Sequence, residues 1–199
     1  MLDQSFSAHN FEVIFDLENR KGDIDINWMP EGYRVAVSEM KKLRQQISEL
    51  KSKGSGKTEE DVERINALEQ AYKKQKDKKK EFRQVFLKDC EVKINSKDFK
   101  FTMTKYLDEE ADKEVFKLNA DEPAVFFAMK QLQYNIHKTF KVKQANRHAI
   151  LCDVKTLLHT MMPLHIIRTD ISSFYESIPQ TVLLEKIEGN TLLSYKSKA

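Results

Sequence analysis

The chain has 199 residues, 40% of them hydrophobic and 33% charged, a composition typical of a globular protein with long solvated helical faces, which excludes disorder throughout. The net charge of +3 is unevenly distributed, because residues 41–88 contain 15 Lys/Arg against 8 Asp/Glu; this segregation permits contact with nucleic acid, and a solvated helix surface explains it as well. No stretch has the ~18 apolar residues of a membrane span and the chain does not start like an export signal, so we expect a cytoplasmic protein without a membrane partner.

The first half of the chain is expected to be mainly helical. In the N-terminal segment 1–32, the apolar strip Phe11–Phe15 indicates a short helix or strand followed by a turn. From residue 33 onwards apolar side chains recur in steps of three and four, which predicts a helix, and Thr58-Glu59-Glu60-Asp61 matches a capping box that predicts the start of a second one. We therefore expect a basic helical hairpin over residues 33–88, whose apolar seam is interrupted by Gln75 and Lys79.

The connection within this hairpin, Gly54-Ser55-Gly56-Lys57-Thr58, is similar to the end of a phosphate-binding loop. That motif needs a glycine where this chain has Lys51, and it needs a buried strand where this chain has a charged helix. We therefore predict a helix-to-helix turn and no nucleotide site there.

Residues 89–163 are expected to contain a small antiparallel sheet and two helices. The period drops to two at Val92–Ile94 and again at Phe99–Met103, and a further short strand is expected at Val115–Leu118, after an acidic loop over 108–112. Asp121-Glu122-Pro123 is typical of a helix start, and that helix should end near Phe140. A second helix is expected over Ile150–His159.

In the last segment, 164–199, a short apolar strand is expected to end in a carboxylate, that of Asp170. A turn at Ser172-Ser173 and a helix over Thr181–Glu188 follow. The sequence therefore predicts an α+β fold, with a helical hairpin followed by a small antiparallel sheet with helices.

Cysteine and histidine spacing argues against a structural metal. Cys90 and Cys152 are isolated and far apart, and the five histidines are scattered. We expect reduced thiols and no zinc site.

The segment Ile166–Ile178, Ile-Ile-Arg-Thr-Asp-Ile-Ser-Ser-Phe-Tyr-Glu-Ser-Ile, closely resembles motif A of reverse transcriptases, in particular the retron-like and phage-defence bacterial enzymes. Residues 126–132 and 140–147 resemble the fingers segments that lead into the palm of these enzymes. The resemblance covers about residues 90–199, and it implies that 89–163 is a fingers-like region and that 164–199 begins an incomplete palm.

The resemblance also implies roles for individual residues. Nucleotidyl transfer uses two divalent cations, and hard cations such as magnesium (Mg²⁺) prefer oxygen ligands. By resemblance, Asp170 bridges both metal ions and the backbone carbonyl of Ile171 binds one of them. The backbone N–H groups of Ser173 and Phe174 hold the triphosphate of the incoming dNTP, and Tyr175 is the steric gate that selects deoxynucleotides.

Each of these residues also has a plainer interpretation. An aspartate after an apolar strand often starts a turn or caps a helix, and Phe174 and Tyr175 are of types common in a core. By resemblance Lys141, Lys143 and Arg147 contact phosphate or template, with solvated charge as the alternative.

A rival function from a different class is a non-catalytic RNA-binding or scaffold module built on the 33–88 hairpin. Its RNA contacts would come from the hairpin lysines Lys73, Lys74 and Lys78–Lys80, for which a solvated helix face is the simpler explanation.

The second carboxylate pair of a reverse transcriptase, the Tyr-x-Asp-Asp turn of motif C, is missing, because the chain contains no Asp-Asp pair. We therefore expect a fragment or truncated product that is inactive alone. The complete protein is expected to be an RNA-directed DNA polymerase of antiviral defence, with a noncoding RNA as template or partner.

Overall fold

The computed structural model of the protein describes residues 3–52, 58–108, 113–119, 121–142, 146–160, 165, 167 and 177–199. The fold is mixed α+β and mainly helical, with one small antiparallel sheet among the described residues, as the sequence predicts at this level. The chain divides into two compact units, Ser5–Gln131 and Met1–Gln4 with Leu132–Ala199, and the boundary falls within helix α4 (Pro123–Thr139).

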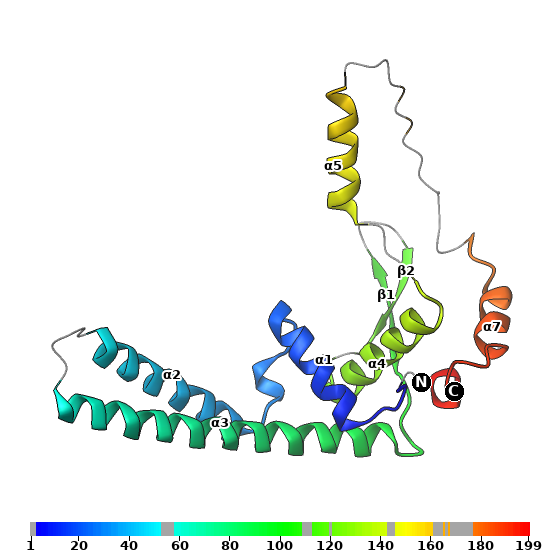
Figure 1. Cartoon of the computed structure of the whole chain (residues 1–199). Helices are drawn as coiled ribbons and strands as arrows, with labels where there is room; N and C mark the ends of the chain where they lie inside the picture. The colour runs from blue at the N-terminus through cyan, green and yellow to red at the C-terminus, as the bar shows by residue number, and fades with distance from the viewer. Residues whose placement is uncertain are drawn as a thin grey trace. The chain divides into compact units, whose positions relative to one another are not determined.

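The predicted helical hairpin is confirmed and is longer than expected. Helix α2 (Glu31–Ser52) lies antiparallel along α3 (Glu59–Ile94), as Figure 1 shows. The capping box is present, because the Thr58 hydroxyl accepts from the N–H of Asp61 at 3.2 Å and the Asp61 carboxylate accepts from the N–H of Thr58 at 3.3 Å. The residues between these helices that are similar to a phosphate-binding loop, 54–57, lie outside the described residues.

Two contacts near the start of α2 bring the helices together. A Cβ on Gly32 would lie 2.4 Å from Cζ of Phe82, so the glycine lets the ring of α3 lie against the backbone of α2. Lys79, which was predicted to weaken the seam, places its Nζ 5.3 Å from the centroid of the Tyr33 ring. The lysine therefore packs within the seam through an aromatic partner.

The core of the larger unit forms where α1 (Ala8–Lys21) packs against α3 and α4. The rings of Phe11 and Phe127 lie 5.6 Å apart, and Phe15 and Leu87 are also almost fully buried. Full burial of each such side chain contributes about 1.5–3 kcal/mol. The N-terminal segment is thus a helix that supplies much of the core, and a short 3-10 helix, Ile26–Trp28, follows it.

The strand predicted at Val92–Ile94 is wrong, because α3 continues to Ile94. Leu87, Cys90 and Ile94 recur in steps of three and four and are all buried, so the helical period determines this stretch.

The small antiparallel sheet itself is confirmed, with strands β1 (Met103–Asp108) and β2 (Lys113–Leu118). Met103 pairs with Leu118 and Lys105 with Phe116. The strand expected at Phe99–Met103 is therefore displaced toward the C-terminus. Met103 and Phe116, which share one face of the sheet, are exposed.

The smaller unit contains α5 (Arg147–Leu158), α7 (Gln180–Glu188) and the short α8 (Tyr195–Lys198), which agrees with the predicted helices over 150–159 and 181–188. In this unit a network of hydrogen bonds joins the N-terminal residue Gln4 and helix α4 to the C-terminal residues. The Asn135 amide donates to the carbonyl of Gln4 at 3.1 Å and to the Ser197 hydroxyl at 3.0 Å, and the Gln4 side-chain oxygen accepts from the N–H of Ser194 at 2.7 Å. Asn135 is fully buried, so these bonds satisfy an amide that has no access to water.

Across the described residues, no helix combines the length and apolar character that a membrane crossing requires.

Candidate functional site

The residues with predicted catalytic and nucleotide-binding roles fall mostly outside the described part of the chain. These are Asp170, Ile171, Ser173, Phe174 and Tyr175, together with Lys143 and most of the predicted strand over 164–170. Their roles stay predictions. What the structure does describe is the pair of helices that bound this segment, α5 before it and α7 after it.

Helix α5 starts at a defined position. The Asn146 side chain accepts from the N–H groups of His148 and Ala149, at 3.0 and 3.3 Å, and so caps the helix. Helix α7 begins directly after Pro179, whose φ of −70° is the ordinary value for proline. The segment that contains Asp170 therefore lies between two helices with clear local boundaries.

Both helices expose apolar side chains, and those of α5 are spaced as on one face of a helix. The exposed residues, each about half accessible, are Ile150, Leu151, Leu157 and Leu158 of α5 and Val182, Leu183 and Leu184 of α7. In α5 the pairs 150 and 157, and 151 and 158, are each seven positions apart and so lie on one face of the helix, whereas the three residues of α7 are consecutive.

Two of the three predicted phosphate contacts are described, Lys141 and Arg147, and both side chains are exposed. Lys141 has φ 51°, the only positive φ outside glycine among the described residues. The N–H of Val142 donates to the carbonyl of His137 at 3.0 Å, so Lys141 ends α4 in the left-handed position that glycine usually occupies. Such a conformation costs a lysine about 1–2 kcal/mol.

Arg147 is the first residue of α5. A cation at a helix N-terminus is opposed by the partial positive charge of the unpaired N–H groups, so this arginine does not stabilise its own helix. Among the described residues neither Arg147 nor Lys141 has a carboxylate within ion-pair distance.

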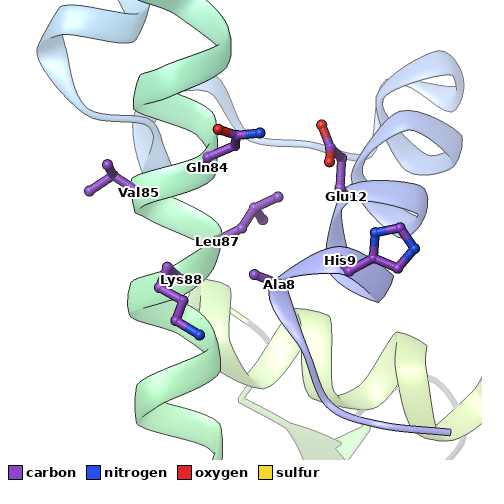
Figure 2. A pocket seen from close by; sticks show the side chains of 7 residues that line it. All are labelled: Ala8, His9, Glu12, Gln84, Val85, Leu87 and Lys88. Atoms are coloured by element: carbon purple, nitrogen blue, oxygen red, sulfur yellow. The ribbon is translucent and has the colours of Figure 1, made fainter. Parts of the chain in front are cut away.

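A groove of about 480 Å³ lies between α1 and α3 in the larger unit (Figure 2). Figure 2 shows Leu87 pointing from α3 toward α1, with Glu12 and His9 on the α1 side. The charged groups of this groove are already engaged: Glu12 binds Arg83, and Lys88 binds Glu91 at 2.9 Å. The groove is therefore a space left between two helices that ion pairs and packing hold together.

The described residues contain no group of three or more His, Cys, Asp or Glu that could hold a metal ion. Cys90 and Cys152 are free. Burial raises the pKa of the Cys90 thiol to about 11, so this cysteine is neutral near pH 7 and unsuited to metal binding or nucleophilic attack.

A second set of candidate functional groups is the lysine-rich part of α3. Residues 73–80 contain six lysines and one aspartate, and all of the lysines except Lys79 are exposed. The sequence signal for this surface is the density of lysine, and the structure adds which of these side chains face solvent.

Comparison of the chain with protein-family models finds no match, and searches of curated proteins and of solved structures find no similar chain.

Proposed function

We propose that this chain is the N-terminal part of an RNA-directed DNA polymerase, a reverse transcriptase, with a fingers-like region over 89–163 and the start of the palm over 164–199. The observation that carries the proposal is the segment Ile166–Ile178, with an aspartate followed by two aromatic residues, Phe174 and Tyr175. The order of the described elements supports it, because the sheet and α4 precede this segment, α5 leads into it and α7 follows it.

The donor atoms at the proposed site suit magnesium. The Asp170 carboxylate and the Ile171 carbonyl are hard oxygen ligands, which Mg²⁺ prefers. When bound, the metal ions lower the pKa of the primer hydroxyl and offset the negative charge of the triphosphate. A second pair of carboxylates is required, and since the chain contains no Asp-Asp pair, we expect this chain alone to be inactive.

The other residues of the segment act on the nucleotide in this proposal. The N–H groups of Ser173 and Phe174 donate to the triphosphate, as successive backbone N–H groups do at other anion sites. The Tyr175 ring takes the space that a ribose 2′-OH needs, so the substrate is a dNTP.

The conformations of Lys141 and Arg147 favour phosphate contacts. Both cations are exposed, one in a strained backbone conformation and the other at a helix end that disfavours positive charge. A polyanionic partner offsets the second of these costs, because it neutralises the arginine at the helix N-terminus, and the template backbone and the triphosphate are the anions that this reaction supplies. Antiviral defence and a noncoding RNA partner complete the proposal and stand on the resemblance, and a cytoplasmic location is added as the expectation from the sequence.

The proposal is tested by Asp170→Asn in the complete polymerase, with incorporation of dNTPs on an RNA template as the measurement. Loss of the bridging carboxylate should lower the rate by at least about 10²–10³-fold, the order of a single electrostatic contribution at an active site. The matched control is Asp153→Asn, which removes an exposed carboxylate from α5 and should leave the rate unchanged. Undiminished incorporation by Asp170→Asn overturns the assignment.

A second candidate function is a non-catalytic RNA-binding or scaffold module built on the α2–α3 hairpin. The exposed lysines of α3 favour it. The two functions are separated by the same variant, because Asp170→Asn should abolish synthesis only if the protein is a polymerase, while RNA binding by α3 is unaffected in either case.

A further inference from the structure

Five exposed lysines between residues 73 and 80 of α3 differ from the ion-paired lysines of the protein. A carboxylate lies within 4 Å of the Nζ atom of seven described lysines, two of them also on α3: Lys21, Lys42, Lys51, Lys88, Lys93, Lys105 and Lys130. By contrast, within the described residues no ion pair is recorded for Lys73, Lys74, Lys76, Lys78 or Lys80, which we call the lysine surface. The positive charge of this surface is therefore not neutralised by the fold.

The lysine surface lies on a stretch of α3 that packs against α2. Tyr72, Gln75 and Lys79 turn toward the α2 side and are partly buried, and Lys79 is held over the Tyr33 ring. Burial lowers the pKa of Lys79, and the nearby Arg83 lowers it further, so this lysine is part of the packing and is distinct from its exposed neighbours. The exposed lysines are thus presented from a backbone fixed by its contacts with α2.

The spacing of these side chains suits a repeating anion. At 100° per residue, Lys73, Lys76 and Lys80 form one row along α3, and Lys74 and Lys78 form another. Successive members of a row are about 5–6 Å apart along the helix axis. A shallow groove of about 410 Å³ runs beside the second row, where Asp77 and Glu81 balance the charges of Lys74 and Lys78, so the net positive charge of the surface comes from the row of Lys73, Lys76 and Lys80.

The surrounding surface argues against a membrane as the partner. An interfacial helix needs a free apolar face beside its basic one. Here the apolar stripe of α3 faces α2, since Ile65 is buried and Leu68 and Tyr72 are partly buried against it. Between residues 73 and 80 the exposed side chains of α3 are all charged, which fits a polyanion that stays in water.

We infer that the lysine surface of α3 binds the sugar-phosphate backbone of a nucleic acid, with RNA and DNA presenting the same phosphate chemistry. The binding is independent of base sequence, because lysine ammonium groups contact phosphates and not base edges. It does not depend on the polymerase proposal, since none of these residues belongs to the segment that contains Asp170.

The test removes three charges from the surface, Lys73→Gln, Lys74→Gln and Lys78→Gln, and measures binding to a hairpin RNA and to a DNA hairpin of the same sequence over a range of salt. Each lost phosphate contact should reduce the slope of log K against log salt by about 0.7–0.9. We therefore expect the slope to fall by about 2–3, with affinity at least about tenfold weaker at low salt.

The matched control makes the same change of net charge at ion-paired, exposed lysines, Lys42→Gln, Lys51→Gln and Lys88→Gln. This control should bind within about twofold of the unchanged protein, and Lys→Arg changes at 73, 74 and 78 should restore binding because the charge is kept. Far-UV circular dichroism confirms that each variant is folded.

Loss of binding confined to the Lys→Gln surface variant supports the inference. Whichever hairpin, RNA or DNA, binds more tightly to the unchanged protein shows which nucleic acid the surface prefers. Equal weakening in the ion-paired control, or an unchanged salt slope in the surface variant, overturns it. Binding of phosphatidylserine vesicles, with no binding of either hairpin, also overturns the inference. The Asp170→Asn protein should bind both hairpins normally, so failure here is distinct from failure of the polymerase proposal.

Discussion

Glu18 shows how a single side chain is stabilised where two helices meet. Its carboxylate is 6% exposed and lies 2.7 Å from Lys130 Nζ of α4 and 2.6 Å from Lys21 Nζ of its own helix. Burial alone raises the pKa of this carboxyl, but the two lysines outweigh burial and hold the pKa below its ordinary value of 4.5. The pair therefore ties α1 to α4 only while Glu18 is ionised.

Glu18→Gln should destabilise the protein by about 1–3 kcal/mol near pH 7, as urea unfolding would measure it. Because the folded pKa is lower than the unfolded one, the carboxylate contributes stability above pH 4.5, and that contribution is lost as the pH falls through the folded pKa. The difference in the free energy of unfolding between Glu18→Gln and the unchanged protein should therefore become smaller in acid. Glu39→Gln, at an exposed pair with Lys42, is the control and should change little at any pH. A pH-independent effect of Glu18→Gln contradicts this explanation.

At the scale of the element, one arginine of α3 binds two carboxylates of α1. Arg83 binds the carboxylates of Glu12 and Asp16, one turn apart on α1, and its guanidinium lies 5.4 Å from the centroid of the Phe15 ring. The arginine side chain is only 18% exposed, so its hydrogen bonds are better shielded than those of a surface pair.

Arg83→Ala should lower the free energy of unfolding by about 1.5–3 kcal/mol, because two charge-assisted contacts and the packing on Phe15 are lost. The matched control is Lys51→Ala, whose pair with Glu69 is about half exposed on both sides and should contribute about 0–1 kcal/mol. Fluorescence of the single tryptophan, Trp28, reports unfolding of the same unit, since its ring lies 5.2 Å from that of Phe126. An equal loss of unfolding free energy in Arg83→Ala and Lys51→Ala would show that Arg83 stabilises the protein no more than an exposed ion pair does.

Local signals in the sequence located helix starts well. The capping box at Thr58 and the proline at position 123 act within one turn, so they need no knowledge of the fold. The end of α3 was missed because Val92 and Ile94 alternate with charged residues over only four positions, too short a window to separate a period of two from one of 3.6. Tertiary packing determines that this stretch is helical, since the helical period is the one that buries Ile94.

At the scale of the whole molecule, contacts between distant parts of the chain were beyond sequence reasoning. Asn135 and Gln4 are 131 residues apart, and no local pattern indicates that one donates to the other. The burial of Glu18 likewise depends on Lys130, on another helix. Two of the predicted site residues, Lys141 and Arg147, are exposed as a role in phosphate binding requires, while the motif around Asp170 stays a prediction from its sequence.

The function proposed for the molecule requires a divalent ion beside residue 170, and metal-directed cleavage locates such an ion directly. Fe²⁺ takes the place of Mg²⁺, with template, primer and dNTP bound to the complete polymerase. Added hydrogen peroxide oxidises it to Fe³⁺ and is split into hydroxide and a hydroxyl radical, which cuts the backbone next to the ion. We predict a cut close to Asp170 that is present in Asp153→Asn and lost in Asp170→Asn. A cutting pattern that is the same with and without the Asp170 carboxylate, or that leaves this segment intact, would contradict the metal site and with it the polymerase proposal.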